Sequence, residues 1–158
     1  MLRLKRPEKS VPGTFSNIVV HVVFSTKNRL PLITGSTGEI LFSYMGGVVK
    51  GVGGSIITMG GMPDHVHLLT RVPTNLSVAD AVRTVKANSS KWINERVSNM
   101  KFGWQRGYGA FSVSHSDVPK VIEYIRNQEW HHRLRSYEEE FEILLTRHQI
   151  DFDKRYLC

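Results

Sequence analysis

Two histidines, His65 and His67, form the pattern with the clearest chemical meaning in this sequence. They follow the turn-forming run Gly-Met-Pro-Asp at 61–64 and alternate with Val66 and Leu68, which suits the start of a β-strand. Because side chains alternate faces along a strand, both imidazoles project from one face, and the two apolar residues point into a core. Paired imidazoles on a strand supply half of a divalent-metal site. A single His-x-His pair also occurs on ordinary strand surfaces, so the rest of the chain must decide.

Tyr124 and Gln128 are a second pair whose residue types could do chemistry. We expect them on a helix that starts near Ser116, because apolar residues follow it at helical spacing: Val118, Val121, Ile122 and Ile125. Being four residues apart, the phenol and the amide stack on one face of that helix, beside the apolar stripe. Taken alone, they are better explained as a tyrosine bordering the core, with its hydroxyl in water, and a surface amide.

Together, the two pairs are typical of phosphodiester chemistry. A phenol can act as a nucleophile and form a covalent intermediate, although its ordinary pKa of about 10 makes it weak without assistance. A divalent cation can polarise a scissile phosphate and orient it for attack. Two imidazoles and one amide oxygen leave coordination positions open for phosphate oxygen and water. Such a mixed set suits Mg²⁺ or Mn²⁺ better than a structural zinc.

The elements that must position these residues follow the order β-α-β-β-α-β. Hydrophobic periodicity and turn residues predict strands at 17–26, 55–60, 65–70 and 110–114, and helices at 36–52 and 77–97. Ser36 with Glu39 fits a capping box for the first helix, and Ser77 with Asp80 fits the start of the second. The order predicts an α+β, ferredoxin-like fold, in which two helices cover one face of a four-stranded antiparallel sheet. We expect the other face to stay open for function and to carry the histidine pair.

The C-terminal part of the chain predicts further helices. Ser136 and Glu139 fit the cap of a last helix from Tyr137 to His148, whose apolar stripe is Phe141, Leu144 and Leu145. This helix is interpreted as packing or dimer support. His131 and His132 lie close to Tyr124 in the sequence and could influence it, although solvated histidines are the favoured interpretation.

Charge indicates a polyanionic partner. The chain of 158 residues carries a net charge of +7, with 21 Lys and Arg against 14 Asp and Glu. Residues 137–158 hold six acids and three bases, a net of −3, so the remaining chain has 18 bases and 8 acids, a net of +10. A body this basic favours nucleic acid, although a generic solvated surface is also compatible with it.

The sequence favours a reduced, cytoplasmic setting without a membrane anchor. No apolar run approaches the roughly 18 residues that span a bilayer, and the basic N-terminus is not followed by a signal-like apolar segment. The single cysteine, Cys158, permits no disulfide within the chain. We expect a basic lead-in at 1–14 and one domain at 15–158.

These motifs carry a resemblance to a known family. His65-Val66-His67 after a Pro-Asp turn resembles the His-hydrophobic-His motif of the HUH endonucleases. Tyr124-x-x-x-Gln128 resembles the tyrosine helix of the IS200/IS605-type single-tyrosine (Y1) transposases. Residues 21–29, 107–114 and 152–157 are similar to the same family. The resemblance covers nearly the whole chain from about residue 15.

The resemblance implies a metal-dependent transposase that acts on single-stranded DNA with hairpins at the element ends. Tyr124 would attack a phosphodiester, leaving a 5′-phosphotyrosine bond and a free 3′-hydroxyl. His65, His67 and Gln128 would hold Mg²⁺ or Mn²⁺. Family members generally work as homodimers, in which the tyrosine helix of one subunit completes the other's site.

Several basic and aromatic residues are candidates for DNA contacts. Phosphate contacts are expected from basic residues in loops and on the second helix: Lys27, Arg29, Arg83, Lys86, Lys91, Lys101 and Arg106. Trp104 and Tyr108, in a glycine-rich loop, are candidates for stacking on unpaired bases. Trp92 fits the buried stripe of its helix better than a stacking role.

Three alternatives stay open from the sequence. The first is a non-catalytic module that binds single-stranded nucleic acid on the same fold, although the chain lacks an RNP1-like aromatic run. The second is a metal-dependent phosphodiesterase that activates water, with Tyr124 only structural. The third is a domesticated HUH nuclease that acts on genomic repeats. The hairpin, the cleavage site, the metal used in the cell and the use of Tyr124 in cis or in trans do not follow from the residues.

Overall fold

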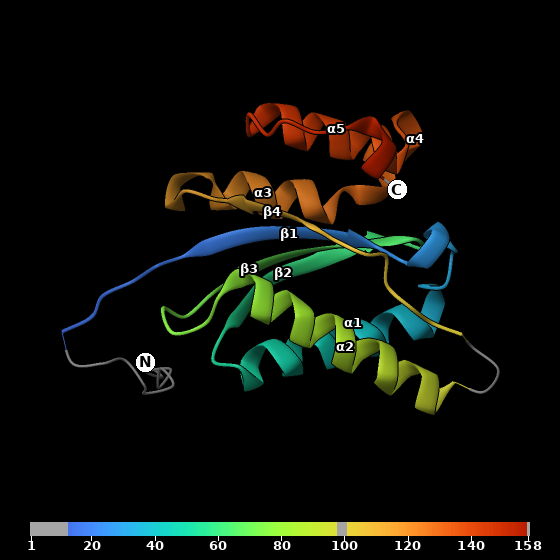
Figure 1. The fold of residues 1–158 in the computed structure, drawn as a ribbon, viewed down its shortest axis with the longest axis horizontal. Coiled ribbons are helices and arrows are strands. Elements are labelled where there is room, and N and C mark those ends of the chain that lie inside the picture. The colour runs from blue at the N-terminus through green and yellow to red at the C-terminus, as the bar shows by residue number, and fades with distance from the viewer. Residues whose placement is uncertain (1–12, 98–100, 158) are drawn as a thin grey trace.

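The computed structural model describes residues 13–97 and 101–157 and contains one antiparallel sheet (Figure 1). Its strands lie in the order β2-β3-β1-β4, with the bounds β1 Val19–Ser25, β2 Ser55–Met62, β3 His65–Arg71 and β4 Gly109–Ser112. Helix α1 (Gly35–Gly51) connects β1 to β2, and helix α2 (Val78–Arg96) connects β3 to β4. The predicted β-α-β-β-α-β order is confirmed. Most of the expected lead-in at 1–14, and Cys158, lie outside the described residues.

One face of the sheet packs on α1 and α2 through alternating β-branched and aromatic side chains. Val22 of β1 pairs with Leu68 of β3, and both lie in the same buried cluster as Phe24. Leu41 and Met45 of α1 are fully buried in that cluster. The same alternation sends Val66 into this core, as predicted, and therefore turns His65 and His67 to the opposite face.

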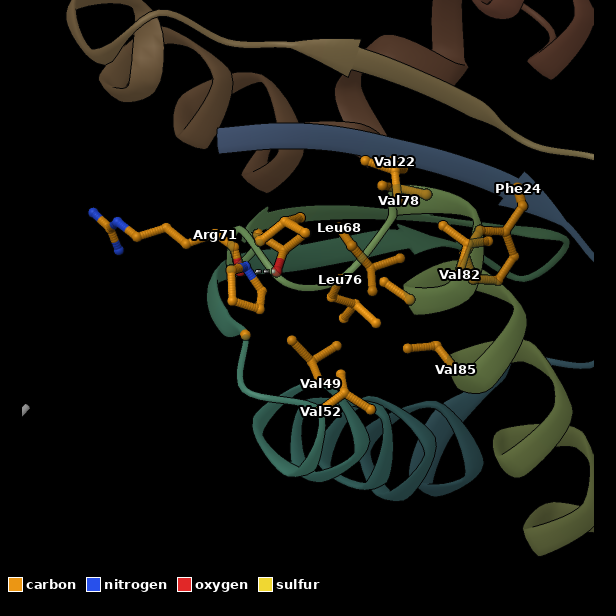
Figure 2. Close-up of a pocket in the computed structure, with 15 residues that line it drawn as sticks. Val22, Phe24, Val49, Val52, Leu68, Arg71, Leu76, Val78, Val82 and Val85 are labelled. Atoms are coloured by element: carbon orange, nitrogen blue, oxygen red, sulfur yellow. Dashed lines mark hydrogen bonds between the residues drawn. The ribbon is translucent and has the colours of Figure 1, made fainter. Parts of the chain in front are cut away.

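Figure 2 shows a small apolar hollow inside this core, between the sheet, α1 and α2. Its volume is about 30 Å³, and apolar side chains such as Val49, Leu76 and Val85 surround it. The Arg71 side chain extends away from it. This hollow is a packing feature of the face remote from the histidines.

The face that was expected to stay open is covered, so that prediction is wrong. Helices α3 (Val118–Arg126), α4 (Gln128–Leu134) and α5 (Tyr137–Arg147) form a second layer above the sheet (Figure 1). Ile125 of α3 packs with Val19 and Leu69, and the two leucines of α5 at 144 and 145 pack with Val23 and Phe111. Burial of these apolar side chains is what closes the face.

The predicted N-terminal capping residues are right for α2 and α5 and wrong for α1 and α3. Ser77 accepts a hydrogen bond from Asp80 N, and Ser136 forms a complete capping box with Glu139. In contrast, α1 begins at Gly35, with no side-chain hydrogen bond at its N-cap. The chain is anchored just before α1, where Ile33 is buried and its N–H donates to the Pro63 carbonyl at 2.9 Å, so the Ser36–Glu39 pattern is not used.

The tyrosine-bearing segment also differs from its prediction. A short 3₁₀ turn, η2 (His115–Asp117), precedes it, so the N-cap residue of α3 is Asp117 rather than Ser116, and its side chain forms no capping hydrogen bond. The helix then breaks at Asn127, whose φ of −98° and ψ of 27° are not helical, and Gln128 opens α4. The predicted strands are right in existence and shifted at their ends by up to two residues.

Two further 3₁₀ turns complete the described chain, η1 (Lys27–Arg29) after β1 and η3 (Lys154–Tyr156) near the C-terminus. None of the helices in the described ranges is long and apolar enough to cross a membrane.

Candidate active site

Strand β3 places His65 and His67 side by side beneath the C-terminal helices. Both side chains are fully buried, and their ring centroids lie 5.2 Å apart. His67 pairs with Val23 of β1, and His65 pairs with Ser25, so two hydrogen-bonded strands fix the histidine backbone. Side chains held in this way are pre-oriented for ligand binding.

Each of these histidines has its Nδ1 atom occupied by a neighbour. Nδ1 of His65 lies 2.8 Å from Asp64 Oδ1, and Nδ1 of His67 lies 2.9 Å from Nε2 of His21. Metal-ligating histidines characteristically use one ring nitrogen for such an orienting hydrogen bond and the other for the metal. Here the Nε2 atoms of both rings face the same carboxylate, that of Glu140.

Glu140 of α5 lies at the centre of the site, although it belongs to neither of the two sequence pairs that predicted the site. Its oxygens lie 3.5 Å from His65 Nε2, 3.4 Å from His67 Nε2 and 2.7 Å from His132 Nε2. The side chain is buried, with 5% of the residue exposed. Ligand atoms of His65, His67 and Glu140 all lie within 4.8 Å of one another, which is close enough for one cation.

Two buried polar atoms in this cluster lack a hydrogen-bond partner among the described residues, His67 Nε2 and Glu140 Oε2. His132 Nε2 approaches Glu140 Oε2, but its N–H has hydrogen-bond geometry toward Gln128 Oε1, at 3.1 Å. Buried polar atoms are rarely left unpaired, and a bound ion is one standard explanation. The cluster therefore fits a cation.

Tyr124 joins this cluster from α3. Its hydroxyl donates a hydrogen bond to Glu140 Oε1, and its ring stands edge-on to His67 with centroids 5.8 Å apart. His131, expected to be solvated, instead lies half-buried with its ring 4.8 Å from that of Tyr124. The alternative interpretation, in which the Tyr124 hydroxyl lies in water, is therefore wrong.

Gln128 is buried, with 2% exposed, rather than a surface amide. Its Oε1 accepts hydrogen bonds from His65 Nε2 at 3.3 Å and from His132 Nε2 at 3.1 Å. Its Nε2 donates to Glu140 Oε1 at 3.1 Å and, at 3.4 Å, to the Tyr124 carbonyl. The break at Asn127 therefore keeps Gln128 next to Tyr124. His132 contacts Glu140 with 9% of its side chain exposed, so it is not a solvated residue.

The electrostatics of the cluster are strongly coupled. Burial raises the pKa of Glu140, but the facing imidazoles of His132, His65 and His67 outweigh it and hold that pKa well below its usual range. Burial lowers the pKa of His65, but its hydrogen bond to Asp64 and the nearby Glu140 carboxylate outweigh this and raise that pKa. Glu140 is therefore an anion, and it offers the cluster its negative charge.

The phenol itself is held in its protonated form. Burial, followed by the neighbouring Glu140 carboxylate, raises the pKa of Tyr124. A phenol in that state is a weak nucleophile unless a cation or a base assists it. A surface hollow of about 270 Å³ borders Tyr124. Its lining includes Arg147, which suits phosphate, and the Lys120–Asp117 ion pair.

The residues singled out for DNA contact are not gathered at this cluster. Arg83, Lys86 and Lys91 belong to α2, on the other side of the sheet from α3. Arg29 of η1 forms a 3.0 Å ion pair with Glu138 of α5. Lys27, Lys101, Arg106 and Tyr108 are exposed. Contact with DNA stays a prediction for all of them.

Two of these candidates have structural contacts of their own. The Trp104 ring stands edge-on to Phe24 and Phe102, and its Nε1 donates to Ser89 Oγ at 2.9 Å. Lys86 Nζ donates to carbonyl oxygens of the loop at 105 and 107. Trp92, expected in the buried stripe, is half-buried and stacks on Tyr44.

The chain is similar in sequence to known proteins. The family model described as "Transposase IS200 like" matches residues 14–128. The transposase for insertion sequence element IS200 of Salmonella typhimurium (strain LT2) is 28% identical over 127 residues, which are 77% of this chain and 83% of that protein. The ISDra2 transposase TnpA of Deinococcus radiodurans is 26% identical over 122 residues, 73% of this chain and 87% of that protein.

Two solved structures share the fold. One is a crystal structure of a candidate transposase from Deinococcus radiodurans R1, with a TM-score of 0.63 and 21% identity over 77% of this chain and 98% of that one. The other is a REP-associated tyrosine transposase bound to a REP hairpin. Its TM-score is 0.56, with 14% identity over 76% of this chain and 71% of that one.

Proposed function

The chain belongs to the IS200-like transposase family, and we propose that it cuts and rejoins single-stranded DNA through a covalent bond to Tyr124. The observation that carries this proposal is the placement of the Tyr124 hydroxyl in the His65–His67–Glu140 cluster, on a carboxylate that both imidazoles also face. A nucleophile and a set of cation ligands are thereby available to one phosphate group.

The proposed step exchanges one phosphodiester for another. Tyr124 Oη forms a bond to the phosphorus while the bond between phosphorus and the 3′-oxygen breaks. The products are a 5′-phosphotyrosine and a strand that ends in a 3′-hydroxyl, and the phenolic proton ends up, in net terms, on that oxygen. The reverse step, with a second 3′-hydroxyl as the nucleophile, rejoins DNA without another energy source.

We propose that His65, His67 and Gln128 hold Mg²⁺ or Mn²⁺. Both imidazoles have an orienting partner on Nδ1, and the Gln128 oxygen lies 3.3 Å from His65 Nε2. When bound, a cation of this kind polarises the scissile phosphate and stabilises charge that develops on its oxygens. The protein's own part is to hold Tyr124 and the phosphate together and to keep water out of the buried cluster.

The proposed partner is single-stranded DNA with hairpins at the ends of the element. A REP hairpin is the ligand of one structural neighbour, and the basic body of this chain suits a DNA partner. A homodimer, a single domain over 15–158 and action in the cytoplasm, where DNA is available, complete the proposal. Whether the chain moves an element or serves a domesticated role depends on the flanking DNA.

The test is a covalent adduct. Labelled single-stranded DNA with an end hairpin is incubated with Mg²⁺ or Mn²⁺ and resolved on a denaturing gel. A labelled species of the size of protein plus DNA is expected for the wild type and for Tyr156→Phe, because Tyr156 is an exposed tyrosine of η3. It is expected to be absent for Tyr124→Phe and with a chelator.

The other outcomes identify the alternatives. Cut DNA without an adduct, retained in Tyr124→Phe, would indicate a phosphodiesterase that activates water. A shift on a native gel with no cutting under either metal would indicate a module that only binds nucleic acid.

A further inference from the structure

Glu140 is unusual among the acids of α5 because it lies in the interior. Glu138 and Glu139, on the same turn, are exposed, and Glu140 is 5% exposed. Buried carboxylates are rare unless they are paired or bind a metal. The position of Glu140 therefore calls for a partner that carries positive charge.

We propose that Glu140 is a further protein ligand to the divalent cation, so that cation binding fastens α5 across the site. This inference rests on the proposed function only in that a divalent cation binds at His65 and His67. It goes beyond it because the ligand comes from a helix outside the residues 14–128 that the family model matches.

The distances suit a shared ion. His65 Nε2 lies 3.5 Å and His67 Nε2 lies 3.4 Å from a Glu140 oxygen. Ligands placed about 2.1 Å from a cation are separated from one another by about 3.0–3.5 Å along the edges of an octahedron or tetrahedron. Both histidine–carboxylate distances have this spacing, and the ligand atoms of all three side chains lie within 4.8 Å of one another. A small cation fits between them without a rearrangement of the backbone.

The two unpaired atoms are the second, independent observation. His67 Nε2 and Glu140 Oε2 belong to residues that are 0% and 5% exposed, and neither finds a hydrogen-bond partner in the described chain. Both face the interior of the cluster. A cation bound by these atoms would satisfy both at once.

Charge favours the carboxylate as well. Two imidazoles and the Gln128 amide bring no net charge to a buried dication, whereas Glu140 brings one negative charge. Hard cations such as Mg²⁺ and Mn²⁺ prefer oxygen ligands, carboxylates above all. Gln128 Nε2 donates to Glu140 Oε1 at 3.1 Å and so orients the carboxylate.

A cation bound by both β3 and α5 would stabilise the segment that contains α4 and α5. Helix α5 is joined to α4 by a short link at Arg135 and Ser136, both exposed. A cation held by β3 and α5 together stabilises the closed arrangement of that segment by mass action. Mn²⁺ is therefore expected to slow tryptic cleavage after Arg133 and Arg135.

The test is titration calorimetry of the full chain with MnCl₂ and no DNA. Glu140→Gln keeps the size of the side chain and removes its charge, and Glu142→Gln is the matched control on the same helix, where Glu142 contacts Lys154. We expect a 10- to 100-fold weaker Mn²⁺ affinity for Glu140→Gln and an unchanged affinity for Glu142→Gln. The protection from trypsin by Mn²⁺ is expected to be lost only in Glu140→Gln.

Thermal melting without metal shows whether Glu140→Gln is folded. If it is not, Glu140→Asp replaces it, and its shorter carboxylate is expected to weaken Mn²⁺ binding as well. Wild-type affinity in a folded Glu140→Gln protein overturns the inference. If folded Glu140→Gln also forms the DNA adduct faster than the wild type, the Glu140 carboxylate instead fills the position of the scissile phosphate and must be displaced when DNA binds. If Glu140→Gln loses Mn²⁺ binding but the wild-type protein forms no DNA adduct, the role of Glu140 as a ligand is supported and the proposed function is wrong.

Discussion

Nε2 of His21 lies 2.9 Å from Nδ1 of His67, and their rings stack with centroids 5.1 Å apart. His21 belongs to β1, and burial, reinforced by the neighbouring His67, lowers its pKa to about 3. It is thus a neutral imidazole, held between two strands, that fixes the orientation of the His67 ring. His67 Nε2 is left directed at Glu140 as a result.

We predict that His21→Ala weakens Mn²⁺ binding by about 10- to 100-fold, because removal of an orienting partner frees the ligand ring. Titration calorimetry measures the affinity, and His115→Ala, at an exposed histidine of η2, is the control. Melting curves without metal separate this effect from lost stability. A folded His21→Ala protein with wild-type affinity would show that His67 is oriented without His21.

The described chain assembles its site from its own residues. Tyr124 contacts Glu140 and the His67 ring within one molecule. We therefore predict that the tyrosine works in cis, so that Tyr124→Phe co-expressed with His67→Ala forms no DNA adduct. If a symmetric dimer used the tyrosine in trans, mixed dimers would instead restore about a quarter of the wild-type adduct. Each variant expressed alone gives the background.

Local patterns explain which site residues could be predicted from the sequence. His65 and His67 are two apart on a strand, so strand periodicity placed that pair. Tyr124 and Gln128 are four apart, so helical periodicity predicted that they lie side by side, and they do so although the break at Asn127 divides them between α3 and α4. The meeting of the two pairs was not visible in either pattern, because it depends on how α3 crosses the sheet.

Glu140 and His21 reach the site over longer distances in the chain. Glu140 lies 16 residues from Tyr124, and His21 lies 46 residues from His67. A weak signal for Glu140 did exist, because it falls between Tyr137 and Leu144 at helical spacing and so shares their buried stripe. An acid on an apolar stripe was the indication that α5 does more than pack. The same helix also explains why the expected open face of the sheet is covered.

Gly60 of β2 sets how closely α3 approaches the sheet. A Cβ at this position would lie 2.8 Å from the Ile125 carbonyl oxygen and 3.0 Å from Ile125 Cγ2. We predict that Gly60→Ala destabilises the protein by roughly 1–3 kcal/mol, because the methyl group pushes α3 away from the sheet. The Tyr124 adduct should fall with it. Urea denaturation and the gel assay measure the two effects.

Gly47 provides the control for that substitution. It lies in α1, and a Cβ there meets no atom within 4 Å. Gly47→Ala is expected to raise stability by about 0.5–1 kcal/mol, as for an exposed helix interior, and to leave the adduct unchanged. Equal stability of the two variants would contradict the role assigned to Gly60.

Lys86 is predicted to have a structural role rather than to contact DNA. Its Nζ donates to the carbonyl oxygens of Gln105 and Gly107 at 2.6 and 2.7 Å, and burial lowers its pKa. These bonds tie α2 to the loop that carries Trp104. We predict that Lys86→Ala lowers the free energy of unfolding by about 1.5–3 kcal/mol, the range for hydrogen bonds to a charged group.

Arg83 lies one turn earlier on α2 and is the matched comparison for Lys86. Its side chain is 77% exposed, and its described ion pair is with Asp80. Arg83→Ala is expected to change stability by less than about 0.5 kcal/mol. If Arg83 contacts phosphate, its loss weakens hairpin binding and reduces the slope of affinity against salt by about one. Denaturation and fluorescence anisotropy at several salt concentrations measure both quantities for both variants. A Lys86→Ala protein with wild-type stability and a reduced salt slope would reverse the assignment, because its ammonium would then be free to neutralise DNA.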